Sequence, residues 1–240
     1  MNASVSKIES FSTIDGPGIR TVIFLNGCNL RCKFCHNPET WIKKEENYSE
    51  EELLNKILRN KPYFKNNGGI TFSGGEPLLQ YDFLINFCKK LKKENIHIAL
   101  DTAGIGNKNY RELLEIVNLI ILDIKSITKE GFIDITQTDH INTAENFIKE
   151  LNNSKKDVWI RQVVVPGVND TKEYMLNLAK YIKTNIKNVK KIELLPFHTM
   201  AFEKYENLKI KNLYKNKSAM DKEKCSELYS VLIEEFQKEH

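Results

Sequence analysis

The stretch CNLRCKFCHN, residues 28–37, contains three cysteines in the spacing C-x3-C-x2-C: Cys28, Cys32 and Cys35. No fourth cysteine lies nearby. Iron–sulfur clusters are usually held by four thiolates, so three thiolates on a four-iron cube would leave one iron without a protein ligand. An open coordination position distinguishes a catalytic metal site from a closed structural one. The spacing therefore predicts a cluster that binds and acts on a small molecule.

A zinc site is the first alternative, since three cysteines and one histidine such as His36 are a known zinc ligand set. His36 directly follows Cys35, however, whereas the ligands of zinc motifs usually stand two or more residues apart. Three buried structural thiols are the second alternative. Both stay open here, although the rest of the chain favours the cluster.

The composition is that of an ordinary globular chain: 240 residues, 41% hydrophobic, 28% charged and a net charge of +4. This charge does not by itself indicate a nucleic-acid partner. Residues 1–14 lack the apolar core of a signal peptide, and the apolar run at 119–122 is too short to span a bilayer. Five cysteines, three of them clustered, fit a metal site in a reducing compartment. We therefore expect a cytoplasmic protein in which Cys88 and Cys225 are not ligands.

Short apolar runs alternate with amphipathic runs along the chain. The predicted strands are 21–25, 69–72, 97–100, 119–124, 158–165 and 191–195. The predicted helices are 82–94, 110–117, 143–151, 171–185 and 222–238, with a further helix that begins at Ser49, where Glu52 completes a capping box. Alternating strands and helices indicate an α/β fold with a parallel sheet, either open and doubly wound or a curved partial barrel.

Polar residues at the ends of the predicted strands favour the partial barrel. In such sheets the functional residues gather at the carboxyl ends of the strands. Each of the six predicted strands ends in, contains or is followed by polar residues. In chain order these are the cysteine loop, residues 73–76, Asp101 with Thr102, Asp123 with Lys125, Arg161, and residues 196–198. We expect these side chains to share one rim of the sheet.

The pattern C-x3-C-x-aromatic-C, with Phe34 as the aromatic residue, resembles the signature of the radical S-adenosylmethionine (SAM) family. The resemblance implies one domain over residues 1–240, with a (β/α)6 partial TIM barrel core at about 15–200 and a C-terminal helical extension at about 201–240. It also implies that the three cysteines bind one [4Fe-4S] cluster, whose fourth iron chelates the amino and carboxylate groups of SAM.

The sequence SGGEP, residues 73–77, resembles the GGE motif of this family. Glycines such as Gly74 and Gly75 let a ligand approach the backbone closely. The carboxylate of Glu76 could accept charge-assisted hydrogen bonds from an ammonium group. The resemblance implies that this segment contacts the methionine end of SAM. By itself SGGE is more often a turn, but its position after a strand and beyond the cysteines strengthens the match.

The sequence DIK, residues 123–125, resembles the D-x-K element that reaches SAM from the fourth strand, which makes Asp123, Ile124 and Lys125 expected contacts. An exposed lysine after a strand is the alternative for Lys125. Arg161 lies in an otherwise apolar strand, where an unpaired buried charge is costly. Either the SAM carboxylate or an acidic neighbour would serve as its partner.

The remaining expected SAM contacts come from the cysteine loop and the last strand. The resemblance implies that Phe34, His36 and His198 lie near the adenosine end of SAM, and that Cys35 and Asn37 also contact the cofactor. A lone histidine is usually structural or exposed, which is the alternative for His198.

The sequence DGPGIR, residues 15–20, precedes the first predicted strand. By itself it indicates a tight turn. In front of the cysteine motif it resembles the activating enzymes of glycyl radical enzymes, in which Asp15 would face the peptide substrate. Further matches at 35–38, 159–161 and 191–196 extend the resemblance over roughly residues 8–198.

Residues 37–68 contain no cysteine, whereas many activating enzymes of this group insert a ferredoxin-like segment there. This absence favours pyruvate formate-lyase (formate C-acetyltransferase) as the protein substrate. Residues 132–141 depart from the usual pattern and weaken this assignment. Residues 204–224 are lysine-rich, and we interpret them as a solvated loop.

Asp101, Thr102 and Asp123 are oxygen donors of the kind that hard cations prefer. The resemblance implies that they hold a monovalent cation beside the SAM carboxylate, together with the backbone carbonyl of Ile121. The alternative is that Asp101 and Asp123 cap the following helices. The usual family pattern here is Asp-Thr-Asn-Gly, but this chain has Ala103, so any contact of that Asn side chain is absent.

The resemblance thus implies an oxidoreductase of anaerobic metabolism, in which Cys28, Cys32, Cys35 and Asp15 serve catalysis. Flavodoxin or ferredoxin would be the electron donor, and we expect a monomer that binds neither nucleic acid nor membrane. The alternatives are an activating enzyme of another glycyl radical enzyme, a different radical SAM enzyme such as a modified-base synthase, and a non-catalytic zinc-stabilised binding module.

Overall fold

The computed structural model describes residues 1–106 and 108–238. The strands are β1 (Asn2–Ala3), β2 (Val5–Ser12), β3 (Arg20–Leu25), β4 (Tyr48–Ser49), β5 (Gly69–Gly74), β6 (His97–Thr102), β7 (Leu119–Asp123), β8 (Asp157–Val164) and β9 (Val189–Pro196). The α-helices are α1 (Glu50–Phe64), α2 (Tyr81–Lys93), α3 (Arg111–Ile116), α4 (Lys129–Thr136), α5 (Ile141–Ser154), α6 (Lys172–Asn185), α7 (Phe202–Asn207) and α8 (Lys222–Gln237). Two 3-10 helices are η1 (Pro38–Thr40) and η2 (Pro77–Gln80).

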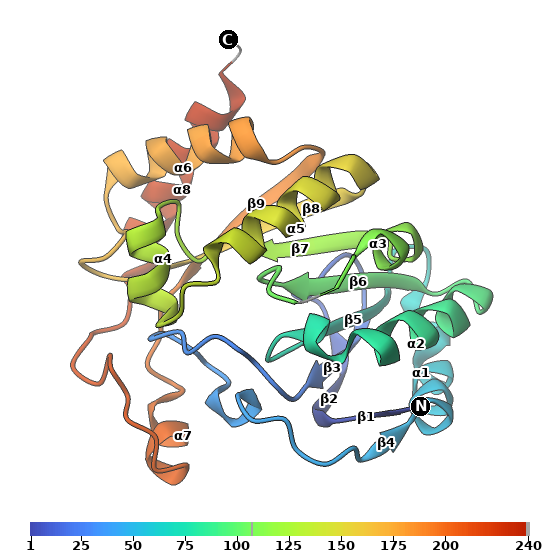
Figure 1. Cartoon of the computed structure of the whole chain (residues 1–240). Helices are drawn as coiled ribbons and strands as arrows, with labels where there is room; N and C mark the ends of the chain where they lie inside the picture. The colour runs from blue at the N-terminus through green and yellow to red at the C-terminus, as the bar shows by residue number, and fades with distance from the viewer. Residues whose placement is uncertain (107, 239–240) are drawn as a thin grey trace.

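Seven strands form one curved sheet in the order β2-β3-β5-β6-β7-β8-β9 (Figure 1). The six strands from β3 to β9 in this sheet run parallel, and β2 adds an antiparallel edge beside β3. The helices that connect the parallel strands lie outside the sheet (Figure 1). The predicted α/β fold with a parallel curved sheet and outer helices is confirmed, and each of the six predicted strands coincides with an observed one.

The sequence analysis missed three elements that matter for the site: β2, α4 and α7. Strand β2 is an edge strand with partly exposed side chains, so its sequence lacks the apolar run of the central strands. The two helices span 8 and 6 residues, which is too short for a clear helical repeat of apolar side chains. Among the described residues, no helix is long and apolar enough to span a membrane.

The predicted capping box at the start of α1 is confirmed. The Ser49 hydroxyl accepts the amide hydrogen of Glu52 at 3.2 Å, and the Glu52 carboxylate accepts the amide hydrogen of Ser49 at 2.8 Å. Each bond satisfies a backbone donor that the first helical turn leaves free.

One large hydrophobic core runs from Ala3 to Leu232 and includes Cys88 and Cys225. Helix α8 packs against α6 and thereby joins the C-terminal part of the chain to the layer of helices outside the sheet. The division into a core at about 15–200 and an extension at about 201–240 stays a prediction.

A fully buried arginine holds the loop between β2 and β3 against the sheet. The Arg20 guanidinium donates to the Thr71 hydroxyl at 2.7 Å, to the Pro17 carbonyl at 2.9 Å and to the Ile70 carbonyl. Burial lowers the pKa of Arg20 to about 10, against the opposing effect of Asp15. The group therefore stays protonated at neutral pH, and its planar donors bring residues 13–19 onto the sheet.

We predict that Arg20→Lys lowers the free energy of unfolding by about 3 kcal/mol, because a single ammonium cannot satisfy the acceptors of a planar fork and buried acceptors left unpaired cost about 1–3 kcal/mol each. The measurement is urea unfolding of the cluster-free protein. The matched control is Arg111→Lys, whose side chain is 84% exposed and which should change stability by less than about 0.5 kcal/mol. Equal midpoints for both variants would contradict the anchoring role of Arg20.

Candidate active site

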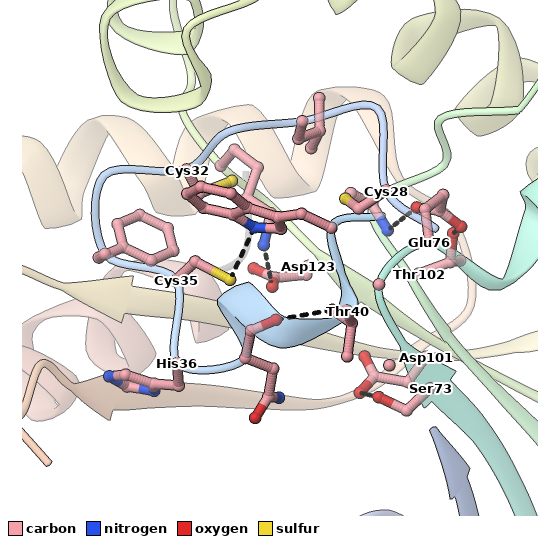
Figure 2. A pocket seen from close by; sticks show the side chains of 18 of the residues that line it. Cys28, Cys32, Cys35, His36, Thr40, Ser73, Glu76, Asp101, Thr102 and Asp123 are labelled. Carbon is pink, nitrogen blue, oxygen red and sulfur yellow. Dashed lines mark hydrogen bonds and ion pairs between the residues drawn. The ribbon is translucent and has the colours of Figure 1, made fainter. Parts of the chain in front are cut away.

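A cavity of about 190 Å³ lies at the carboxyl ends of the parallel strands, and all three clustered cysteines line it (Figure 2). Most of the other predicted site residues line the same cavity: Phe34, His36, Asn37, Gly74, Gly75, Glu76, Asp101, Thr102, Asp123 and Lys125. The predicted convergence on one rim of the sheet is therefore present for these residues. Asp15, Ile121, Ile124, Arg161 and His198 do not line the cavity.

Helix α4 holds one side of the cysteine loop through the backbone. The amide of Arg31 donates to the carbonyl of Thr136, and the amide of Lys33 donates to the carbonyl of Ile135, both at 2.9 Å. The Lys33 ammonium also pairs with Asp134 at 2.5 Å. The carboxyl end of α4 thus sets the path of the chain between the first and third cysteines.

Helix α7 holds the other end of the loop. The Tyr205 hydroxyl donates to the carbonyl of Cys35 at 2.9 Å. The Lys204 ammonium donates to the carbonyl of His36 at 2.9 Å and pairs with Glu39 at 2.6 Å. The interpretation of the lysine-rich segment as a solvated loop is therefore wrong at its start, because these two side chains fold back onto the cysteine loop.

Cys32 is buried and Cys28 and Cys35 are partly buried, which favours the neutral thiols in the absence of a metal. Burial raises the pKa of Cys28 to about 12, and the Glu76 carboxylate adds to this rise. Burial also raises the pKa of Cys32 and of Cys35. A metal group replaces thiol protons when it binds, so its positive charge would offset the cost of burying three thiolates.

The geometry disfavours the zinc alternative. Among the described residues, no three Cys, His, Asp or Glu side chains converge on the position of a single ion. The ring of His36 instead stacks on that of His198, with centroids 3.7 Å apart. His36 is thus engaged with a second histidine, while the three thiols line the cavity.

The two glycines of the SGGEP segment are required by neighbouring backbone. A Cβ at Gly75 would lie 2.2 Å from the carbonyl oxygen of Gly27, and one at Gly74 would lie 2.3 Å from the amide nitrogen of Leu25. Gly74 also has a positive φ of 121°. We expected these glycines to make room for a ligand. In the structure, the backbone at and just after the end of β3 excludes a side chain at both positions.

Glu76 is 1% exposed, and both of its carboxylate oxygens accept hydrogen bonds. The donors are the Thr102 hydroxyl at 2.5 Å, the Leu78 amide at 3.1 Å and the Ala103 amide at 3.0 Å. Burial raises the pKa of Glu76, while these bonds act to lower it. Glu76 therefore joins the end of β5 to the end of β6 within the cavity wall.

The Lys125 side chain is only 12% exposed and lies beside Asp123, so the alternative of an exposed lysine is wrong. The Lys125 ammonium pairs with Asp123 Oδ2 and lies 5.4 Å from the centre of the Phe34 ring. Burial acts to lower the pKa of Lys125, but Asp123 and the nearby thiols raise it, and the net shift is upward. The other oxygen of Asp123 is buried and has no hydrogen-bond partner, which marks a contact that a ligand in the cavity can complete.

Arg161 lies among acidic side chains, and an acidic neighbour was one of the two partners expected for it. Its guanidinium is 2.9 Å from Glu193, 3.5 Å from Asp101 and 3.7 Å from Asp15, and it also donates to the carbonyl of Ile14. The register of the sheet produces this cluster, since Arg161 pairs with Glu193 across β8 and β9. The loop between β2 and β3 is thus joined to β8 through the contacts of Arg161 with Asp15 and Ile14.

The expected cation ligands lie on the neighbouring strands β6 and β7, where Asp101 is in register with Ile121, and several of their side chains already have partners. Asp101 accepts from Ser73 and pairs with Arg161. The Thr102 hydroxyl donates to Glu76, and Ile121 packs in a small apolar cluster. The alternative that Asp101 and Asp123 cap helices is also wrong, because the N-cap residues of α3 and α4 are Tyr110 and Thr128.

Two expected SAM contacts lie behind the cavity wall. Ile124 is buried and donates its amide hydrogen to the carbonyl of Arg161 at 2.8 Å. His198 is not among the residues that line the cavity, and its ring stacks on that of His36. Burial, followed by the effect of His198, lowers the pKa of His36 to about 4, so the His36 imidazole is neutral at neutral pH.

Sequence analysis missed Thr40, Trp41, Lys204 and Tyr205. The carbonyl of Thr40 accepts the amide of Gly27 at 2.7 Å, and the Trp41 indole donates to the Cys35 sulfur at 3.2 Å. A tryptophan six residues after the last clustered cysteine was a usable signal. No local pattern could reveal the other three residues, because their contacts with the loop come from tertiary packing or from the backbone.

Comparisons with known proteins agree with this site. A family model for the radical SAM superfamily matches residues 22–182. The chain is 48% identical over 232 residues to the pyruvate formate-lyase-activating enzyme of Clostridium pasteurianum, which covers 96% of this chain and 97% of that one. It is 38% identical to the enzyme of the same name from Staphylococcus epidermidis, over 95% of this chain and 94% of that one.

A solved structure shows the same fold at much lower identity. A radical SAM methyltransferase from Sphaerobacter thermophilus superposes with a TM-score of 0.62 at 14% identity, over 90% of this chain and 64% of that one. The matched superfamily model and the near full-length match to the activating enzymes agree with the cavity and its three cysteines. The chain therefore belongs to the radical SAM superfamily and, within it, to the family of pyruvate formate-lyase-activating enzymes.

Proposed function

We propose that this chain activates pyruvate formate-lyase by generating a glycyl radical on it, with one [4Fe-4S] cluster and SAM as cofactors. The observation that carries this proposal is the 48% identity over almost the full length of both chains to an enzyme with this name. The cavity adds independent support, since Cys28, Cys32 and Cys35 line it and, among the described residues, no other cysteine does.

When bound, the cluster would supply one electron that splits SAM into methionine and a 5′-deoxyadenosyl radical, and this radical would take a hydrogen atom from a backbone glycine of the partner. The protein would hold the cofactors, orient the partner and exclude water. Cys28, Cys32 and Cys35 would ligate the cluster and leave one iron open for the amino acid end of SAM.

The walls of the cavity offer complementary groups for the two ends of SAM. Glu76, together with Gly74 and Gly75, would receive the ammonium group at the methionine end. At the other end, the free oxygen of Asp123 would accept a hydroxyl hydrogen, and its buried partner Lys125 would hold it in place. Phe34, His36 and Asn37 would pack along the adenosine end.

Asp15 would act on the partner protein. The guanidinium of Arg161 pairs with both Asp15 and Asp101, so one side chain separates Asp15 from the cavity wall. We expect Arg161, Ile124 and His198 to support the cavity from behind. Hydrogen abstraction needs the glycine backbone close to the 5′ carbon, so orientation by Asp15 contributes more than affinity.

The remaining parts of the proposal concern the surroundings of the enzyme. Flavodoxin or ferredoxin would donate the electron, and the monomer would work in the cytoplasm, where five unpaired thiols stay reduced. The monovalent cation at Asp101, Thr102, Ile121 and Asp123 stays a prediction. Two carboxylates of that set already have a cationic partner, Lys125 for Asp123 and Arg161 for Asp101, although Asp15 and Glu193 share Arg161.

The cluster assignment predicts a difference between the two kinds of cysteine. The double variant Cys88→Ala/Cys225→Ala should keep about four iron and four sulfide ions per chain after anaerobic reconstitution, because both thiols lie in the apolar core. Cys32→Ala should lose them. Metal and sulfide analysis checks this, and stoichiometric zinc in the wild-type protein would refute the cluster.

The SAM site predicts that Glu76→Gln weakens SAM binding about tenfold, since a charge-assisted hydrogen bond contributes about 1.5–3 kcal/mol and 1.4 kcal/mol is a factor of ten. Calorimetric titration of the reconstituted protein with SAM is the measurement. Glu52→Gln is the matched control, because Glu52 lies in the exposed first turn of α1. If both variants bind SAM as tightly as the wild type, Glu76 has only its structural role.

The role of Asp15 predicts that Asp15→Asn lowers the yield of glycyl radical on pyruvate formate-lyase at least tenfold while SAM cleavage without partner continues. The amide keeps the size of the side chain and can still accept from Ser12, but it loses the charge. Electron paramagnetic resonance of the partner and chromatography of 5′-deoxyadenosine measure the two steps. If the Asp15→Asn variant gives as much glycyl radical as the wild type, Asp15 only forms the turn. If the wild-type enzyme instead forms a glycyl radical only on a different glycyl radical enzyme, the proposed partner protein is wrong but the proposed reaction is not.

A further inference from the structure

Trp41 donates a side-chain hydrogen bond to the sulfur of one of the three clustered cysteines. Its indole nitrogen is 3.2 Å from Cys35 Sγ, and the dashed line that ends on this sulfur in Figure 2 marks the bond. Among the described side chains, no other donates a hydrogen bond to the sulfurs of Cys28, Cys32 or Cys35. The three sulfurs that face the cavity are therefore not equivalent.

The backbone of Trp41 is tied to the opposite end of the cysteine loop. The carbonyl of Trp41 accepts the amide hydrogen of Cys28 at 3.2 Å, and its own amide donates to the carbonyl of Pro38 at 3.1 Å. Trp41 thus bridges the first and third cysteines: its main chain bonds Cys28 and its side chain bonds Cys35.

Two side chains hold the indole ring in its orientation. The guanidinium of Arg31 lies over the ring at 5.2 Å from the centroid, and it also donates to the carbonyl of Cys28 at 2.6 Å. The ring of Tyr205 meets the indole edge-on at 5.8 Å, while the Tyr205 hydroxyl holds the carbonyl of Cys35. Both neighbours of the ring therefore also bind the loop, so the N–H direction is set before any cofactor arrives.

We propose that Trp41 is a positioning residue that raises the reduction potential of the cluster through its hydrogen bond to Cys35, with Tyr205 of α7 holding the indole in place. Hydrogen bonds to cluster sulfurs are one of the means by which proteins tune this potential. Reduction adds one electron, and part of its charge resides on the sulfur ligands. A fixed N–H donor is attracted more strongly to the reduced state, and its removal makes reduction harder.

This inference rests on the cluster of the proposed function, and the experiment separates the two. The midpoint potential of the reconstituted wild-type cluster is first measured by titration with dithionite, followed by electron paramagnetic resonance. A wild-type protein that binds no cluster refutes the proposed function. A wild-type cluster whose potential does not depend on Trp41 refutes only this inference.

The test variant is Trp41→Phe, which keeps an aromatic ring and removes the N–H donor. We expect iron content to stay near that of the wild type and the equilibrium constant for reduction to fall about tenfold, which is about 59 mV for a one-electron couple. The matched control is Trp159→Phe, at the second of the two tryptophans, which packs against Ala99, Leu119 and Ile121. Its potential should equal that of the wild type.

A third variant, Tyr205→Leu, tests the clamp apart from the donor. It leaves the N–H in place and removes the edge contact and the bond to the Cys35 carbonyl, so the potential should fall in the same direction by a smaller amount. A wild-type potential in Trp41→Phe, or an equal shift in Trp159→Phe, overturns the tuning role. Loss of the cluster from a folded Trp41→Phe protein also overturns it, because Trp41 would then act in cluster assembly. An unchanged potential in Tyr205→Leu overturns the clamp.

Discussion

The packing of the cysteine loop against the carboxyl end of β5 is the contact on which the rest of the site depends. The amide of Gly75 donates to the carbonyl of Leu25 at 2.9 Å, and the amide of Glu76 donates to the carbonyl of Gly27 at 2.8 Å. A Cβ at Gly75 would collide with this backbone. Two glycines therefore bring the start of the cysteine loop and the Glu76 carboxylate to the same wall of the cavity.

Three cations, Arg20, Arg161 and Lys125, organise the charge near the site. Arg20 binds the loop after β2 through the carbonyl of Pro17. Arg161 pairs with Asp15 of the same loop and with Asp101. Lys125 compensates Asp123 at the next strand end. Buried carboxylates are costly unless they are paired, so these cations allow acidic groups for the cofactor and the partner to stand close together.

Much of the fold could be predicted from local sequence. The six parallel strands are short apolar runs, and helices such as α2 and α6 are long enough to show their periodicity, which is why their positions agree with the structure. Strand β2 and helices α4 and α7 could not be predicted in the same way. Their side chains are too exposed or too few to form a pattern, and they are stabilised by contacts with segments distant in the chain.

The sequence by itself determined the chemistry: three cysteines at a spacing that leaves a cluster open, the SGGEP and DIK segments, and the membership of a family. Residue type and spacing carry that information because ligand chemistry depends on which groups follow each other on one loop. Only the tertiary structure decided which side chain neutralises which. It paired Arg161 with acidic neighbours, buried Lys125 against Asp123 and brought Trp41 and Tyr205 onto the cysteine loop. The contacts of Arg161 with Glu193 and of Tyr205 with Cys35 join residues far apart in the chain. Lys125 and Trp41 are close to their partners in sequence, but the direction of each side chain depends on the surrounding fold.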